Sequence, residues 1–164
     1  MTLKSRILGI DPGSRTTGYG IIDKDGSRIG FVTCGTIRTT SGWALSDRLL
    51  EIFEGLMQVI DQHQPDVTAV EDLFVAHNPR SALKLGQARG VAVLAAVKNG
   101  MPVHDYSPRA VKQAVAGYGH AEKEQVQHMV CALLELSSSP SSDAADALAV
   151  AICHANQMTI AAVG

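Results

Sequence analysis

Four acidic residues of this chain occupy positions where a charge is rarely left unpaired. Asp11 ends the apolar run 7–10, and Glu71 ends the largely apolar run 67–70. Asp143 and Asp146 lie three residues apart in the segment 142–149. Burying an unpaired charge is costly, so acids gathered at the ends of buried strands normally share a compensating cation. A ligand set made only of carboxylates suits Mg²⁺, or Mn²⁺ in its place, and the first hypothesis is therefore metal-assisted phosphate chemistry.

The spacing of these acids indicates how they could work together. Residues three apart on a helix share a face, with about 5–6 Å between Cβ atoms, so Asp143 and Asp146 should point the same way. Both are expected in the first turn of a helix, where the macrodipole favours negative charge. Asp11 and Glu71 would lie side by side if their strands are neighbours. Two metal ions roughly 3.5–4 Å apart could then activate a water and stabilise the leaving oxygen. Taken singly, Asp143 also fits a helix N-terminal acid, and Asp11 before Pro-Gly fits a turn.

The elements that must position the acids follow from hydrophobic periodicity. Strand patterns cover 6–10, 17–23, 27–38, 66–71 and 102–106, and helical patterns cover 43–62, 78–98, 108–116, 121–136 and 142–157. Asp25-Gly26 predicts a hairpin turn, while Asn78-Pro79, Ser107-Pro108 and Ser142 predict helix starts. The element order predicts an α/β domain in which helices flank a mixed five-stranded sheet.

The length and composition are those of a single domain spanning residues 1–164. No apolar stretch approaches the ~20 residues needed to cross a bilayer, and the run before Asp11 is too short for a signal peptide. We therefore expect no membrane association. Cys34, Cys131 and Cys153 are widely spaced and form no CxxC pair, which predicts reduced core cysteines in a cytoplasmic protein.

Positive charge is concentrated in the segment 79–123, although the formal net charge of the chain is −2. Its cations are Arg80, Lys84, Arg89, Lys98, Arg109, Lys112 and Lys123, against the acids Asp105 and Glu122. A basic segment of this kind fits a polyanionic partner, and a solvated basic face explains the same pattern. Charge alone does not decide between them.

Six ordered blocks of the chain resemble the RuvC family of bacterial Holliday-junction resolvases, from Ile7 to about His154. The blocks are Gly9–Ser14, Val70–Phe74, Ser81–Gly90, Val111–Gln113, Ala121–Lys123 and Asp143–Leu148. The resemblance implies an RNase H-like fold of the retroviral integrase superfamily, a homodimer, and Mg²⁺-dependent paired nicking of four-way DNA junctions in recombination and repair. It implies that Asp11, Glu71, Asp143 and Asp146 are the catalytic, metal-binding acids, and that the RuvA–RuvB branch-migration complex is a partner.

The resemblance also implies roles for several residues in DNA binding. Lys112 and Lys123 match lysines near the scissile phosphate, where they would give salt-dependent affinity; without the match they fit solvated helix lysines. Phe74 matches an aromatic residue that stacks on unpaired bases, although its sequence context alone favours a core position. Arg80, Lys84 and Arg89 are further candidate phosphate contacts, but helical spacing cannot place all three on one face.

Three other functions fit parts of the sequence. The turn after Asp11, followed by Gly18 and Gly20, resembles the phosphate loop of actin-like ATPases and sugar kinases, but such nucleotide-binding modules need a second lobe. A YqgF-type nuclease-like protein shares the first block only. A non-catalytic junction-binding dimer would gain only repulsion from acids beside phosphates. The dimer surface could be helix 43–62 or helix 78–98.

Overall fold

The computed structural model describes residues 4–72 and 78–163, whose five strands form one mixed sheet. The strands are β1 Lys4–Asp11, β2 Thr16–Asp25, β3 Arg28–Arg38, β4 Val67–Glu71 and β5 Val103–Tyr106. The sheet order is β3-β2-β1-β4-β5. The first three strands form an antiparallel meander, and β4 and β5 continue the sheet in parallel on the other side of β1. The predicted mixed five-stranded sheet is confirmed.

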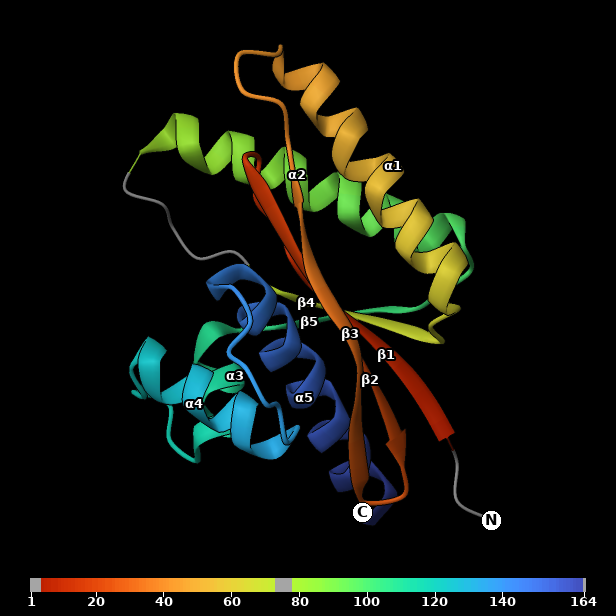
Figure 1. The fold of residues 1–164 in the computed structure, drawn as a ribbon, viewed down its shortest axis with the longest axis vertical. Helices are drawn as coiled ribbons and strands as arrows, with labels where there is room; N and C mark the ends of the chain where they lie inside the picture. The colour runs from red at the N-terminus through yellow and green to blue at the C-terminus, as the bar shows by residue number, and fades with distance from the viewer. Residues whose placement is uncertain (1–3, 73–77, 164) are drawn as a thin grey trace.

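Helices cover both faces of this sheet (Figure 1). Helices α1 Leu45–His63 and α2 Pro79–Lys98 pack on one face, and α3 Pro108–Ala116, α4 Lys123–Leu133 and α5 Ser142–Val163 on the other. Side chains alternate along a strand, so Ile7 packs in the core below α5, while Leu8 and Ile10 pack against α1 and α2. The same alternation turns Asp11 towards α5. In the described part of the chain, no helix is long and apolar enough to span a membrane.

The predicted helix starts at α2 and α3 are confirmed by their capping contacts. The Asn78 side chain accepts a hydrogen bond from the Arg80 amide at 2.9 Å, with Pro79 as the first helical residue. The Ser107 Oγ accepts from the Ala110 amide at 3.1 Å, and α3 ends at Gly117 with a φ of 91°. That positive φ suits glycine, which lacks the Cβ that would clash there.

Two predicted local features are shifted by one residue. Asp25 still belongs to β2 and pairs with Arg28, so the central residues of the hairpin are Gly26 and Ser27. The last helix is capped by Ser141 and not by Ser142, because the Ser141 Oγ accepts from the Ala144 amide at 3.3 Å. Both shifts follow from backbone hydrogen bonding, which composition alone does not fix.

The lengths of the last two helices also differ from the prediction. Helix α4 ends at Leu133, short of residue 136, because Glu135 adopts a φ of 54°, which no α-helix continues. Helix α5 extends to Val163, beyond residue 157. Its extension carries a long-range contact, in which Lys24 Nζ of β2 donates to Thr159 Oγ1. The three cysteines are free, as predicted, although Cys153 alone is fully buried.

Candidate active site

Three of the four predicted acids converge at one end of the sheet. One carboxylate oxygen from each of Asp11, Asp143 and Asp146 lies within 4.8 Å of the other two. Asp11 comes from the end of β1, and the two other acids come from the start of α5. Asp146 lies in the second turn of α5, so the expectation that both helix acids occupy the first turn is wrong for that residue. All three side chains are partly buried.

Glycines on the sheet explain how α5 comes so close to Asp11. Gly18 of β2 is the register partner of Asp11, and a Cβ placed on Gly18 would lie 2.1 Å from the backbone oxygen of Asp143. Gly9 makes a similar approach, since a Cβ added there would lie 2.0 Å from the backbone oxygen of Ala147. The start of α5 therefore packs directly on the strand backbone. The alternating glycines of 18–20, which resemble a phosphate loop in the sequence, serve this close packing in the fold.

Glu71, the fourth acid, lies beside this group and not within it. Strands β1 and β4 are parallel neighbours, and Ile10 is opposite Val70, so Asp11 and Glu71 follow side by side, as predicted from the strand ends. The next residue, Asp72, has an oxygen 3.9 Å from Arg89 of α2, on the other face of the sheet. Strand alternation therefore directs Glu71 towards α5 and the succeeding acid away from it.

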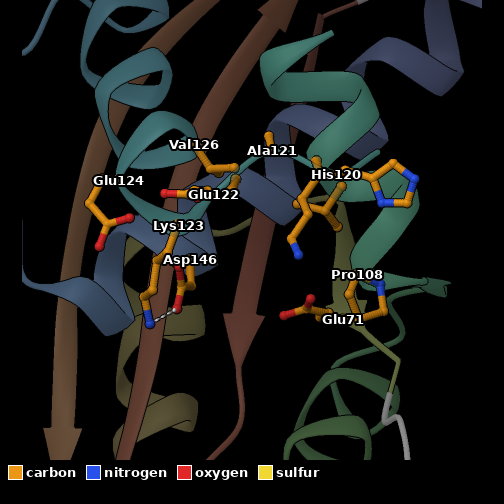
Figure 2. Close-up of a pocket in the computed structure, with 12 residues that line it drawn as sticks. Glu71, Pro108, His120, Ala121, Glu122, Lys123, Glu124, Val126 and Asp146 are labelled. Carbon is orange, nitrogen blue, oxygen red and sulfur yellow. Dashed lines mark ion pairs between the residues drawn. The ribbon is translucent and has the colours of Figure 1, made fainter. Parts of the chain in front are cut away.

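A cavity of about 540 Å³ opens beside the acids. Glu71 and Asp146 form part of its wall (Figure 2). Helix α3 contributes Lys112, α4 contributes Lys123, and the segment between the two helices contributes His120. The cavity thus brings the two lysines of the basic segment next to two of the acids. Glu122 and Glu124 also line it. Sequence reasoning missed these two acids, because their spacing around Lys123 is ordinary for a solvated helix start.

The electrostatics of the cluster favour a bound cation. Burial and the negative charges of Asp146, Asp143 and Glu71 raise the pKa of Asp11 to about 8, with Lys123 opposing the rise. Burial and Asp146 likewise raise the pKa of Glu71, and burial raises that of Asp146. Acids that resist full ionisation when alone ionise readily around a divalent metal, because the metal offsets their mutual repulsion. Hard oxygen ligands of this kind fit Mg²⁺ or Mn²⁺.

One lysine contacts the acids directly. Lys123 Nζ lies 3.2 Å from Asp146 Oδ2 (Figure 2). Burial lowers the pKa of Lys123, but Asp146, Asp11 and Asp143 together raise it by more, so the lysine remains charged. The positive charge of Lys112 lowers the pKa of the Glu71 carboxyl and so opposes the larger effect of burial, which raises it.

The other residues predicted to contact DNA are dispersed. Phe74 lies outside the described residues. Arg80 and Lys84 are exposed near the start of α2. Arg89 is different, because its side chain is only 22% exposed and its guanidinium pairs with Asp105 and Asp72. These three of the basic residues of α2 therefore do not form one surface, as helical spacing predicted, and their roles in DNA binding remain predictions.

A mixed sheet ordered β3-β2-β1-β4-β5, with acids gathered where β1 and β4 meet the last helix, defines an RNase H-like α/β protein. The family model described as "Crossover junction endodeoxyribonuclease RuvC" matches residues 7–154, and the chain belongs to this family. A protein of that name from Geobacter sulfurreducens is 57% identical over 158 residues, which cover 96% of this chain and 96% of the relative.

Solved structures agree with this assignment. The structure described as "T. thermophilus RuvC in complex with Holliday junction substrate" superposes with a TM-score of 0.90 and 34% sequence identity, over 96% of each chain. A yeast mitochondrial Holliday junction resolvase superposes with a TM-score of 0.70 at 17% identity, over 96% of this chain and 81% of that one, which shows the shared fold.

Proposed function

We propose that this chain is a Mg²⁺-dependent endonuclease that resolves Holliday junctions by paired, symmetric nicks in four-way DNA, during homologous recombination and DNA repair. The observation that carries the proposal is the convergence of Asp11, Asp143 and Asp146 beside a cavity that also holds Lys112 and Lys123. Acids alone would repel a phosphodiester, and lysines alone would only bind it. Both together suit metal-assisted hydrolysis of a phosphodiester. Membership of the RuvC family supports four-way DNA as the substrate.

In this proposal the acids hold two Mg²⁺ ions, which Mn²⁺ can replace. Asp11, Asp143 and Asp146 provide ligands for one shared position, and Glu71 extends the site along the end of β4. When bound, the ions supply an activated water and charge stabilisation for the leaving oxygen. The chain itself contributes an ordered arrangement of acids, because backbone packing of α5 on Gly18 restricts where Asp143 can lie.

In this proposal the two cavity lysines bind the DNA backbone. Lys123 and Lys112 line the cavity from α4 and α3, where they could contact a phosphate that approaches the acids. They would neutralise the scissile phosphate and stabilise the extra negative charge of the transition state. Phe74, Arg80, Lys84 and Arg89 complete the proposed DNA contacts, with Arg89 the weakest because its charge is already paired.

A homodimer accounts for two coordinated nicks, since a four-way junction presents two equivalent strands. A row of exposed apolar side chains on α2 favours this helix, and not α1, as the dimer surface. Leu83, Leu94 and Val97 are 67%, 58% and 56% exposed, and Gly86 and Gly90 between them have open space where a Cβ would be. Their spacing places them along one face of α2, where a second copy could pack closely. Contact with the RuvA–RuvB complex and a cytoplasmic location belong to the same proposal and rest on the family.

The proposal is tested with a mobile synthetic four-way junction and Mg²⁺, with a linear duplex of the same sequence as the control. We expect symmetric nicks in the junction only. Asp11→Asn should keep junction binding and lose at least roughly a hundredfold in nicking rate, because a neutral amide is a poor metal ligand. Asp61→Asn on the exposed surface of α1 is the matched control and should cut normally. Wild-type nicking by Asp11→Asn would show that the proposed mechanism is wrong.

A further inference from the structure

A second cavity, of about 340 Å³, lies where the β1–β2 turn meets the starts of α1 and α2. In Figure 1 this turn crosses α2, on the face of the sheet away from α3–α5. Three cations and two hydroxyl side chains line the cavity, and no acid does. The lining residues are Gly13, Ser14, Arg15, Arg48, Ser81, Lys84 and Leu85. Neither Arg15 nor Arg48 has a role in the proposed nuclease site.

Arg48 is fixed in this cavity by neutral partners. Its Nη2 donates to the backbone oxygen of Ser14 at 2.8 Å, and its Nε donates to Thr39 Oγ1 at 3.2 Å. Neither partner cancels the positive charge. The acid one turn further along α1, Glu51, instead accepts hydrogen bonds from the amide and hydroxyl of Thr40. Arg48 therefore holds the turn in place, and the negative charge of Glu51 acts on it only from beyond ion-pair distance.

The other two cations are also without an acidic partner. Within residues 4–72 and 78–163, no carboxylate lies at ion-pair distance from Arg15, Arg48 or Lys84. Lys84 lies in the second turn of α2, whose first turn contains no acid. The positive end of a helix macrodipole disfavours cations and favours anions. Three cations that form no ion pair at such a place favour the binding of an anion.

We propose that this cavity binds a backbone phosphate of a DNA strand that passes from the acidic site around the β1–β2 turn. The inference rests on the proposed function, because it places the same strand at both sites. Asp11 and Arg15 are four residues apart, which bounds their Cα separation at about 14 Å. A DNA strand carries one phosphate per roughly 3.4 Å of helix axis, so a few nucleotides cover that distance. The cavity would thus hold a phosphate near the nick and fix the direction of the strand.

The test measures junction binding in Ca²⁺ for wild type, Arg15→Gln and Lys84→Gln across a salt series. Both side chains are exposed, so neither change should unfold the protein. Each lost phosphate contact should reduce the slope of log K against log salt by about 0.9 and weaken binding roughly threefold to tenfold. Lys98→Gln, at the far end of the same helix, is the matched control and should match wild type.

Three outcomes separate the possible explanations. Unchanged affinity and salt slope in both variants, with normal wild-type nicking, would overturn the phosphate site and leave the proposed function intact. Reduced slopes in a protein that nicks no junction would support the site and reject the resolvase. If inorganic phosphate raises the melting temperature of wild type and not of Lys84→Gln, while DNA binding is unchanged, the cavity takes a small phosphate ligand and the assignment to DNA is wrong.

Discussion

Lys123 Nζ of α4 lies 3.2 Å from Asp146 Oδ2 of α5, which joins a lysine implied in DNA contact to an acid implied in metal binding. The two side chains are 56% and 26% exposed, so the pair adds roughly 0–1 kcal/mol to stability at most. Its importance lies in the site itself. A divalent cation and Lys123 would compete for the same negative charge, while a DNA phosphate would attract the lysine away from the acid.

Lys123→Met should therefore change metal binding and nicking in opposite directions. Removing roughly 1 kcal/mol of repulsion should tighten Ca²⁺ or Mg²⁺ binding about fivefold. Nicking at saturating Mg²⁺ should fall at least about tenfold, because the transition state loses a cation. Calorimetric metal titration and single-turnover cutting measure the two effects. Lys112→Met, which removes the other cavity lysine, should slow nicking with a smaller change in metal affinity. Weaker metal binding by Lys123→Met would mean that the lysine orients Asp146.

The raised pKa of Asp11 predicts how the stability of the metal-free protein, kept in a metal chelator, depends on pH. The pKa is about 8 in the fold and 3.8 ordinarily, because burial and the neighbouring acids disfavour the charged carboxylate. The folded state thus binds more protons than the unfolded state between these values, and stability falls as pH rises from about 4 to 8. Asp11→Asn removes this cost, so it should exceed wild type by on the order of 1–3 kcal/mol at pH 8 and match it near pH 4.

Urea unfolding in EDTA at several pH values measures this difference. The wild type should recover at pH 8 when Mg²⁺ is added, since the ion binds the folded state only, and Asp11→Asn should gain less. The raised pKa values of Glu71 and Asp146 act in the same direction and remain in the variant. An Asp11→Asn protein that is less stable than wild type at pH 8 would contradict the assigned electrostatic cost.

Glu71 and Asp146 should differ in how strongly they hold metal. Asp146 belongs to the three-acid group, and Glu71 lies beside it. Asp146→Asn should therefore weaken divalent binding about ten- to hundredfold, and Glu71→Gln should weaken it less, although both should abolish most nicking. Isothermal titration with Mn²⁺ compares the two variants under the same conditions. Equal losses of affinity would indicate that Glu71 shares the ion of the other acids.

Much of the fold could be predicted because its signals are local. Apolar runs located the strands to within a few residues, and Asn78-Pro79 and Ser107-Pro108 located two helix starts through capping chemistry. Parallel pairing of β1 with β4 then brought Asp11 beside Glu71, as two buried strand ends suggested. The predicted C-terminal ends of α4 and α5 were wrong. The end of α4 depends on the left-handed backbone conformation of Glu135, and the extension of α5 carries the contact between Lys24 and Thr159. Neither the backbone conformation of Glu135 nor the Lys24–Thr159 contact can be predicted from the spacing of apolar residues.

The arrangement of the site depended more on tertiary packing. Helical spacing correctly predicted that Asp143 and Asp146 share a face, but it could not give the depth at which α5 packs. That depth is set by contacts between α5 and the backbone of β1 and β2. The Lys123–Asp146 pair likewise requires α4 to lie against α5, which no sequence period encodes. The pairing of Arg89 with Asp105 is another tertiary contact that helical spacing could not predict.

Gly18→Ala should test whether close packing of α5 positions the acids. The added Cβ would lie 2.1 Å from the Asp143 backbone oxygen, and neither backbone atom can move away by changing a rotamer. The start of α5 must shift instead, at a cost of about 1–3 kcal/mol. A displacement of even ~1 Å at the reacting groups can slow catalysis about a hundredfold. Gly30→Ala on β3, where the Cβ meets open space, is the matched control and should be close to neutral. Single-turnover nicking at excess Mg²⁺, at a temperature where thermal unfolding shows both variants folded, compares them. Wild-type nicking by a folded Gly18→Ala would show that the acids tolerate movement of α5, and that Gly18 serves packing alone.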